Sequence, residues 1–437
     1  MTNYTLKKYK FPAVKRLRVV SSFEGGDVTS DGGGLFLRMV EKKLNLLRPI
    51  AKEFKDARDQ SKVEHDIFTM LQQRVFCQAL GYEDLNDHNA LRKDVAIQAM
   101  VGSDNDLASS STLCRLENTA DRSIAWTIHK RMVNVFIDSF DEAPKELVLD
   151  FDATDDLVHG NQAGKFFNGY YRNYCFLPLY VFCGKQLLVA YLRRSDRDGA
   201  RHAWAILSLL AKKLRQAWPD VKIIFRGDSG FCRDKMLEWC DKNNVYYITG
   251  VARNKRLEAE LLPQTNQAKE DFEQTRIKQK TFAKFSYAAK SWSRERKIIG
   301  KAEHSSKGSN PRFIVTNLDG DSQHLYEKVY CARGDMENRI KEMQLGLFSD
   351  RTSCSAWWAN QLRLLFAALA YVLMEYIRRI ALPKTEFENA QMNTIRLRLL
   401  KIGAVVTKNT RRICILLSTH FPLKALFEKM YVALTPT

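Results

Sequence analysis

The stretch that decides the fold is Leu147-Val148-Leu149-Asp150-Phe151-Asp152, an apolar run broken by two acids. Side chains along a β-strand alternate between its two faces, so Asp150 and Asp152 are predicted to share one face. Leu149 and Phe151 should occupy the other. A carboxylate on a buried strand needs a cation or a metal ion beside it, because an unpaired buried charge is costly. The alternative is that one of these acids caps the turn that follows.

The residues around this stretch predict a mixed sheet. Strands are expected at 146–151, 175–183, 186–192, 221–225 and 245–251, and helices at 203–217 and 234–243. The order βββ-α-β-α-β indicates an α/β fold in which helices flank a mixed sheet. Residues 252–325 interrupt this pattern, with a polar linker expected at 262–271 and short strands after it. Residues 35–140 are expected to be mostly helical.

Composition narrows the class of protein. The 437 residues are enough for two or three domains. Lys and Arg number 69 against 50 Asp and Glu, and the net charge of +19 predicts a polyanionic partner, either nucleic acid or an acidic membrane surface. Nine scattered cysteines without a CxxC pair argue against a disulfide framework and against a cysteine-rich zinc site, and favour a reducing cytoplasm.

One segment, residues 356–374, is apolar enough to be considered as a membrane span. It contains Arg363, Asn360 and Gln361, and it stands alone in a very basic chain. We therefore expect a buried core helix here rather than a membrane segment.

Two further acids occupy positions suited to catalysis. Asp228 lies in Arg226-Gly227-Asp228-Ser229-Gly230-Phe231, directly after the fourth predicted strand. The carboxyl end of a strand, before a glycine-rich turn, is a common catalytic placement in open sheets. The alternative is a turn or helix cap.

The third candidate site, Glu337, lies in a basic segment. If residues 330–344 are helical, one face carries Tyr330, Arg333, Glu337, Lys341 and Gln344. An acid flanked by cations suits a metal ligand beside a phosphate. A surface ladder of ion pairs would give the same pattern.

Taken together, these blocks resemble the DDE transposases of bacterial insertion sequences, in particular the transposase DDE domain group 1. That group has a Tyr-Arg-Glu-Lys signature and an RNase H-like core. The resemblance runs from about residue 20 to the end of the chain. The residues that carry it are Asp150-Phe151-Asp152-Ala153-Thr154-Asp155-Asp156, His159-Gly160, Phe167-Asn168-Gly169-Tyr170-Tyr171, Arg226 to Phe231, and Tyr330 to Glu342.

The resemblance implies roles for individual residues. Asp152, Asp228 and Glu337 become the catalytic acids and the ligands of two Mg²⁺ ions, or of Mn²⁺ in their place. Asp150 is the alternative ligand to Asp152. The signature residues that contact phosphate are Tyr330, Arg333 and Lys341. Gln344 stands where the group has its signature lysine.

The resemblance also implies a domain organisation and partners. Residues 1–140 are expected to form a mostly helical DNA-binding region, and residues 252–325 a β-rich insertion. The RNase H-like catalytic domain, with its C-terminal helices, is expected at 141–251 and 326–437. The expected partners are double-stranded DNA with terminal inverted repeats, target DNA and a second copy of the chain, in the bacterial cytoplasm at the nucleoid and without a membrane.

Candidate DNA contacts follow from clusters of basic residues. The arm at 1–20 has six basic residues and no acid. In the insertion, cations alternate with aromatic residues that could stack on an unpaired base, although such aromatics are more often core. The candidates are Lys280, Lys284, Trp292, Arg294, Arg296 and Lys297, together with Arg396, Arg398, Arg411 and Arg412 near the C-terminus.

The function predicted from the sequence is therefore a DNA transposase. It would bind the ends of its mobile element, cleave phosphodiester bonds and transfer 3′-hydroxyl ends to target DNA. Two alternatives stay open. One is an RNase H-like nuclease without strand transfer, and the other is a catalytically silent DNA-binding protein derived from a transposase.

Overall fold

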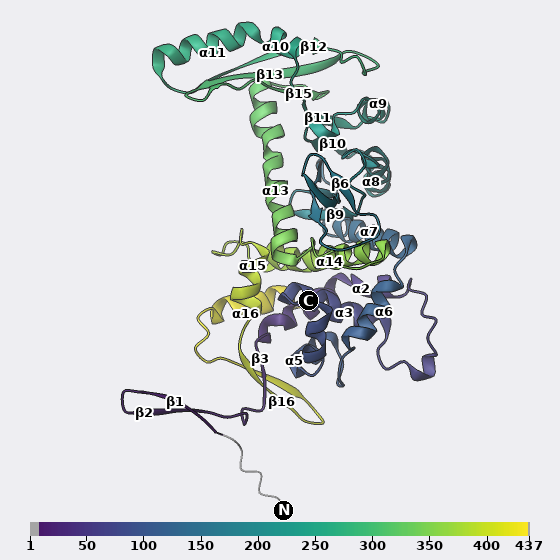
Figure 1. The fold of residues 1–437 in the computed structure, drawn as a ribbon, viewed down its shortest axis with the longest axis vertical. Helices are drawn as coiled ribbons and strands as arrows, with labels where there is room; N and C mark the ends of the chain where they lie inside the picture. Colours follow the sequence, from purple (N-terminus) through teal and green to yellow (C-terminus); the bar gives the residue numbers. More distant parts are fainter. Residues whose placement is uncertain (1–7, 436–437) are drawn as a thin grey trace, which may run out of the picture. The chain divides into compact units, whose positions relative to one another are not determined.

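The computed structural model describes residues 8–435. The chain forms two compact units, one from the residues up to Thr119 together with Leu369 onward, and one from Ala120 to Ala368. Figure 1 shows the ribbon coloured along the sequence. These units do not follow the boundaries at 140, 251 and 325 expected from the sequence, because the last 69 residues group with the N-terminal ones. Lys7 of the predicted basic arm lies outside the described residues.

The larger unit is built on a nine-stranded sheet within the described part of the chain. Its order is β12-β13-β15-β11-β10-β4-β8-β9, with β14 paired to β13. Strands β10 and β11 run parallel to β4, and the other pairs are antiparallel. The strands are β4 (Glu146–Ala153), β8 (Leu179–Cys183), β9 (Gln186–Tyr191), β10 (Lys222–Gly227), β11 (Tyr246–Val251), β12 (Gln279–Tyr287), β13 (Arg296–Ser305), β14 (Gly308–Ser309) and β15 (Arg312–Thr316).

Helices cover both faces of this sheet. On one side, α7 (Arg122–Ile137), α8 (Ala203–Ala217) and α9 (Asp234–Lys242) bury their apolar residues with Leu149 and Phe151 in the main core. On the other side, a smaller core joins the sheet to a helical segment that includes α13 (Gly334–Lys341) (Figure 1). The predicted α/β fold, a mixed sheet flanked by helices, is confirmed, and Leu149 and Phe151 do share a face.

The insertion does not form a separate sheet. Its strands β13 and β15 pair in turn onto β11, so that the insertion extends the central sheet at one edge. It also contains α10 (Lys255–Glu260) and α11 (Leu262–Thr275), and Figure 1 shows α11 along β12 and β13. The polar linker predicted at 262–271 is therefore wrong. The helix begins with Pro263 in its first turn and buries Ala268, and packing on the sheet outweighs its polar composition.

The strand predicted at 175–183 is in fact two strands. Strand β7 (Asn173–Phe176) pairs with β5 (Asp156–Leu157) and β6 (Phe166–Asn168) in a small sheet, whereas β8 belongs to the central sheet. Pro178 lies between them and has no N–H to donate to a ladder, which explains why the strand breaks there.

The smaller unit joins the two ends of the chain. Strand β3 (Asp27–Thr29) pairs with β16 (Ala404–Lys408), which pairs with β17 (Ile413–Leu417). Its other elements include the hairpin β1 (Tyr9–Val14) and β2 (Leu17–Ser21), and the helices α1 (Leu35–Leu44), α2 (Leu47–Ala51), α3 (Ile67–Leu80), α4 (His88–Leu91), α5 (Val95–Val101), α6 (Ser110–Asn118), α15 (Met392–Ile395) and α16 (Lys424–Leu434).

The glycines at 32–34 form a buried turn where this unit closes. A Cβ on Gly33 would lie 2.3 Å from the carbonyl oxygen of Leu399, so only glycine allows the two backbones to approach this closely. This turn seats the N-terminal helices on the C-terminal segment of the same unit.

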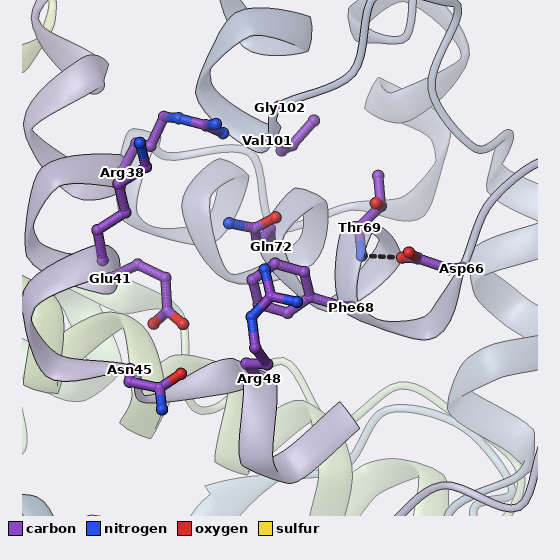
Figure 2. Close-up of a pocket in the computed structure, with 11 residues that line it drawn as sticks. Arg38, Glu41, Asn45, Arg48, Asp66, Phe68, Thr69, Gln72, Val101 and Gly102 are labelled. Atoms are coloured by element: carbon purple, nitrogen blue, oxygen red, sulfur yellow. Dashed lines mark hydrogen bonds between the residues drawn. The ribbon is translucent and has the colours of Figure 1, made fainter. Parts of the chain in front are cut away.

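A pocket of about 370 Å³ lies among the N-terminal helices of this unit. Figure 2 shows the residues that line it, including Arg38 and Arg48. The Arg48 guanidinium lies 4.2 Å above the ring centroid of Phe68. Asp66 accepts a hydrogen bond of 2.6 Å from the Thr69 amide and so caps α3. With Lys42, the pocket has three basic side chains.

The predicted core helix at 356–374 is confirmed as part of α14 (Trp357–Ala381), most of whose apolar side chains are buried. None of the helices in residues 8–435 has the length and apolar character needed to cross a bilayer. All nine cysteines lie among the described residues and are free thiols.

The pH dependence of stability tests the packing of the smaller unit. Burial and the charge of Arg74 lower the pKa of His88 to about 3. Because the unfolded chain binds this proton near pH 6.5, the stability that neutral His88 contributes is present above pH 6.5 and is lost as the pH falls toward 3. Between pH 7 and pH 5, we expect the unfolding free energy of the wild type to fall by about 2 kcal/mol more than that of His88→Gln. Urea titrations at both pH values measure this difference, and parallel losses in the two proteins would contradict it.

Candidate active site

Two of the predicted acids meet at one edge of the sheet. Asp152 lies near the carboxyl end of β4, and Asp228 directly follows β10, the parallel neighbour of β4. Burial and then the charge of Asp228 raise the pKa of Asp152 to about 6. The two carboxylates are therefore close enough to repel each other. Asp228 also accepts a 2.8 Å hydrogen bond from the Gly230 amide, so the predicted turn cap is formed as well.

The strands that carry these acids are joined by a buried ion pair. Arg226 of β10 stands in register opposite Asp150 of β4. Its Nε and Nη2 donate to the two carboxylate oxygens of Asp150, the second at 2.7 Å. The third nitrogen, Nη1, donates to the carbonyl oxygen of Val329. Asp150 is only 4% exposed and Arg226 8%. Because both oxygens of Asp150 are engaged, Asp152 is favoured over Asp150 as a metal ligand.

The third acid comes from a helical segment that runs without a break from Ser322 to Gly346. It comprises α12 (Ser322–His324), a π-helical stretch η5 (Leu325–Tyr330), a 3-10 turn η6 (Cys331–Arg333), α13 and a second π-helical stretch η7 (Glu342–Gly346). The helix predicted for this region is therefore confirmed. Val329, which accepts a hydrogen bond from Arg226, immediately precedes Tyr330 in this segment.

Arg333 links the first and third acids. Its Nη2 lies 3.0 Å from Oε1 of Glu337, and its Nη1 lies 3.9 Å from Oδ2 of Asp152. Burial acts to lower the pKa of Arg333, but Tyr330 and the charges of Asp152, Glu337 and Asp228 outweigh it, so the pKa is raised. Glu337 is 50% exposed at its side chain. The ion pair considered as an alternative for this helix is thus formed. The same Arg333 side chain links Glu337 to Asp152.

Asp152 and Glu337 lie against the guanidinium of Arg333 rather than against each other. Among residues 8–435, no three His, Cys, Asp or Glu side chains are grouped closely enough to hold a metal ion. Carboxylates that approach without a counter-charge repel each other, and Arg333 supplies that charge here. The donors that Asp152, Asp228 and Glu337 offer are all oxygens, which suits Mg²⁺ or Mn²⁺. Their role as metal ligands stays a prediction.

Tyr330 is held close to the sheet by a glycine of β11. A Cβ on Gly250 would lie 2.7 Å from Oη of Tyr330 and 2.9 Å from the amide nitrogen of Ser229. Only glycine leaves room for the tyrosine beside the turn that carries Asp228. The ring of Tyr330 also lies 6.0 Å from the guanidinium carbon of Arg333.

The later residues of the signature behave differently. Lys341 is exposed at the end of α13. Gln344, which stands in place of a lysine, donates from Nε2 to the carbonyl oxygen of Asp155 at 3.0 Å and to Oδ1 of Asp156 at 3.2 Å. It therefore ties the helical segment to the loop after β4. Asp156 is fully buried, and burial raises its pKa well above the usual range.

Two residues of the site were not predicted from the sequence. Arg226 stands in the motif around Asp228, but its register with Asp150 cannot be known before the strands pair. Tyr171 belongs to the resemblance but carried no predicted role. Burial and the charges of Asp155, Asp152 and Asp228 raise the pKa of Tyr171, which places this side chain near the acids.

The predicted DNA contacts fall into three groups. Arg296 is buried between Asp234 and Asp241, and Arg396 is buried and donates at 2.7 Å to the carbonyl oxygen of Ala79. Both side chains are engaged within the fold, and their role as DNA contacts stays a prediction. Lys280, Arg294 and Lys297 are ion-paired with Glu327, Asp241 and Asp319, and Trp292 packs on Tyr287. The exposed candidates are Lys284, Arg398, Arg411 and Arg412.

Comparison with known proteins identifies the family of the chain. The sequence profile of transposase DDE domain group 1 matches residues 11–437, and the chain belongs to this family. It is therefore a DDE-type transposase by family. No curated protein matches the chain. Among solved structures, the chain is similar to a piggyBac transposase seen by cryo-EM in a synaptic complex with hairpin DNA. The sequences are 11% identical with a TM-score of 0.45, over 85% of this chain and 80% of that one. A likeness at this level says nothing about residue roles.

The buried ion pair can be tested by stability. Asp150→Asn removes the counter-charge of a buried arginine, so we expect the free energy of unfolding to fall by about 3–5 kcal/mol. Asp220→Asn changes an exposed acid just before β10 and should cost less than about 0.5 kcal/mol. Guanidinium titrations of the two variants measure the contrast. Equal stability of Asp150→Asn and the wild type would show that the pair does not hold the strands together.

Proposed function

We propose that this chain is a DNA transposase that binds the ends of its mobile element, cleaves phosphodiester bonds there and transfers the 3′-hydroxyl ends to target DNA. One observation carries the proposal: in a chain of the DDE family, Asp152 and Glu337 lie on either side of Arg333, and Asp228 is close enough to raise the pKa of Asp152. Two acids thus lie at one edge of the sheet, and the third lies across Arg333 from the first.

The acids would hold two Mg²⁺ ions, or Mn²⁺ in their place. When bound, such ions activate the attacking oxygen and stabilise the leaving one. Asp152 feels the charges of both Asp228 and Glu337, so it would be the residue that the two ions share. With a pKa of about 6 it holds a proton for part of the time near neutral pH, and binding a cation would release that proton.

Arg333 would change partners during the reaction. Its guanidinium offers donors that suit carboxylate and phosphate equally well. When cations neutralise the acids, the same side chain can donate to an oxygen of the scissile phosphate. Tyr330, held over Gly250, would limit the positions that the phosphate can take.

The exposed cations support DNA as the partner. Lys284 on the insertion, the Arg411–Arg412 turn between β16 and β17, and the basic side chains of the pocket in Figure 2 are accessible. We infer that the smaller unit binds double-stranded DNA with terminal inverted repeats, in the bacterial cytoplasm at the nucleoid. Pairing two ends would require a homodimer in the DNA complex.

The catalytic assignment is tested on supercoiled DNA that carries the element's ends, in Mg²⁺. Asp228→Asn should lower cleavage by at least about 100-fold, because the carboxamide cannot hold the cation, and should leave binding of the ends unchanged. Asp220→Asn, at the opposite end of β10, is the matched control and should cut like the wild type.

The products separate the alternatives. Joined products from the wild type support the transposase, and cut products without joining indicate a nuclease. Binding without cutting by the wild type indicates a silent scaffold. Full cleavage by Asp228→Asn would reject the site.

A further inference from the structure

The small sheet next to the active site ends in a tyrosine-rich loop. Strands β6 and β7 are joined by residues Gly169–Arg172, which we call the tyrosine loop. Tyr170 at its tip is 87% exposed, and Phe167 and Tyr174 on the flanking strands are about half exposed. The proposed function gives this loop no role.

Hydrogen bonds hold the backbone of the loop although its tip is exposed. The Asn168 side chain accepts hydrogen bonds from the amides of Tyr170 (2.9 Å) and Tyr171 (3.2 Å), and it donates to the carbonyl oxygen of Ser195 at 2.9 Å. The amide of Arg172 donates at 2.8 Å to the carbonyl oxygen of Asn168. A backbone held in this way loses little entropy when a ligand binds the loop.

The loop also lies beside the catalytic acids. Oη of Tyr171 is 3.5 Å from the carbonyl oxygen of Ala153, which follows Asp152. The ring centroids of Tyr170 and Tyr171 are 4.9 Å apart, with their planes at 87°. The ring of Tyr171 therefore lies between Tyr170 and the acids, and the ring of Tyr170 is exposed to solvent.

Cations packed on the strands that flank the tyrosine loop suit a nucleic acid strand. Lys165 lies over the ring of Tyr174, at 5.5 Å from its centroid, and Arg194 over the ring of Phe166 at 4.1 Å. Arg194 is also paired with Asp196. An exposed aromatic face among cations can stack on a base while the cations attract its phosphates.

The aromatic residues of the insertion are not available for this task. Tyr287 is buried, Trp292 packs on it at 5.7 Å between ring centroids, and Phe282 packs on Tyr326 at 5.7 Å. Tyr170 is therefore a better candidate than these residues for stacking on a base.

We infer that Tyr170 is a binding site for an unpaired nucleobase of the DNA strand that is cut, next to the scissile phosphate. The inference rests on the proposed function. Stacking of the base on Tyr170 would fix the position of the strand. Because Tyr171 contacts both Tyr170 and Ala153, the strand would be held next to Asp152. Tyr170 touches the substrate but takes no part in bond making or breaking.

The test uses full-length chains that carry Asp228→Asn, so that no DNA is cut. Duplexes with the element's end carry a single unpaired 2-aminopurine, which is moved one position at a time along the terminal nucleotides. At one position, Tyr170→Ala should weaken binding of the unpaired duplex by roughly 5- to 100-fold relative to the paired duplex, with a change in 2-aminopurine fluorescence. Tyr170→Phe keeps the aromatic face and should restore both. Trp126→Ala removes another exposed aromatic residue, on α7, and should change neither.

Several outcomes would overturn the inference. Equal binding and fluorescence for Tyr170→Ala and its parent at every position would do so, and if the wild type still cuts DNA, the proposed function would survive. Loss of self-association in Tyr170→Ala with DNA binding intact, seen by sedimentation, would make the loop a protein contact instead. A wild type that neither binds nor cuts DNA would remove the proposed function together with the inference.

Discussion

The buried pair of Arg226 and Asp150 is the constraint on which the site depends. It joins β4 to β10 in one register and, through the carbonyl of Val329, attaches the helical segment to both strands. The three acids come from these three elements, so the pair sets where each of them lies. Two charges in an interior are expensive, and their attraction repays that cost only when the geometry is good and the remaining donors are satisfied. Arg226 meets this condition with all three nitrogens engaged. The pair therefore fixes the positions of β4, β10 and the helical segment more than it stabilises the fold.

The acids themselves are arranged at a cost. Asp152 has a folded-state pKa of about 6, raised above its unfolded value by burial and by Asp228. A carboxyl shifted in this direction contributes stability at low pH that is lost as the pH rises through its folded pKa, so at neutral pH the fold carries a penalty. Arg333 offsets part of it by lying between Asp152 and Glu337. Binding of cations would relieve this electrostatic penalty. Natural active sites commonly accept such a loss of stability in return for function.

Local patterns in the sequence were enough for much of this structure. The alternation around Asp150 and Asp152 predicted the faces of β4, and the spacing of Arg333 and Glu337 predicted their shared helical face. What failed depended on contacts between distant residues. The helix α11 follows from packing on the extended sheet, the joining of β3 to β16 from pairing of the two ends of the chain, and the burial of Arg296 from two acids on α9. The register between two strands also depends on contacts between distant residues. For this reason the sequence alone could not identify Arg226 as the partner of Asp150.

The central claim is that Asp152, Asp228 and Glu337 act together on divalent cations, although Glu337 here pairs with Arg333. Calorimetric titration of Mn²⁺ into the metal-free chain bound to an uncleavable DNA end tests it most directly. The account predicts that Asp152→Asn, Asp228→Asn and Glu337→Gln each lower the Mn²⁺ affinity by at least about tenfold, whereas Glu327→Gln, on the same helical segment, has no effect. Wild-type Mn²⁺ binding by Glu337→Gln would contradict the account, because Glu337 would then be only the surface partner of Arg333.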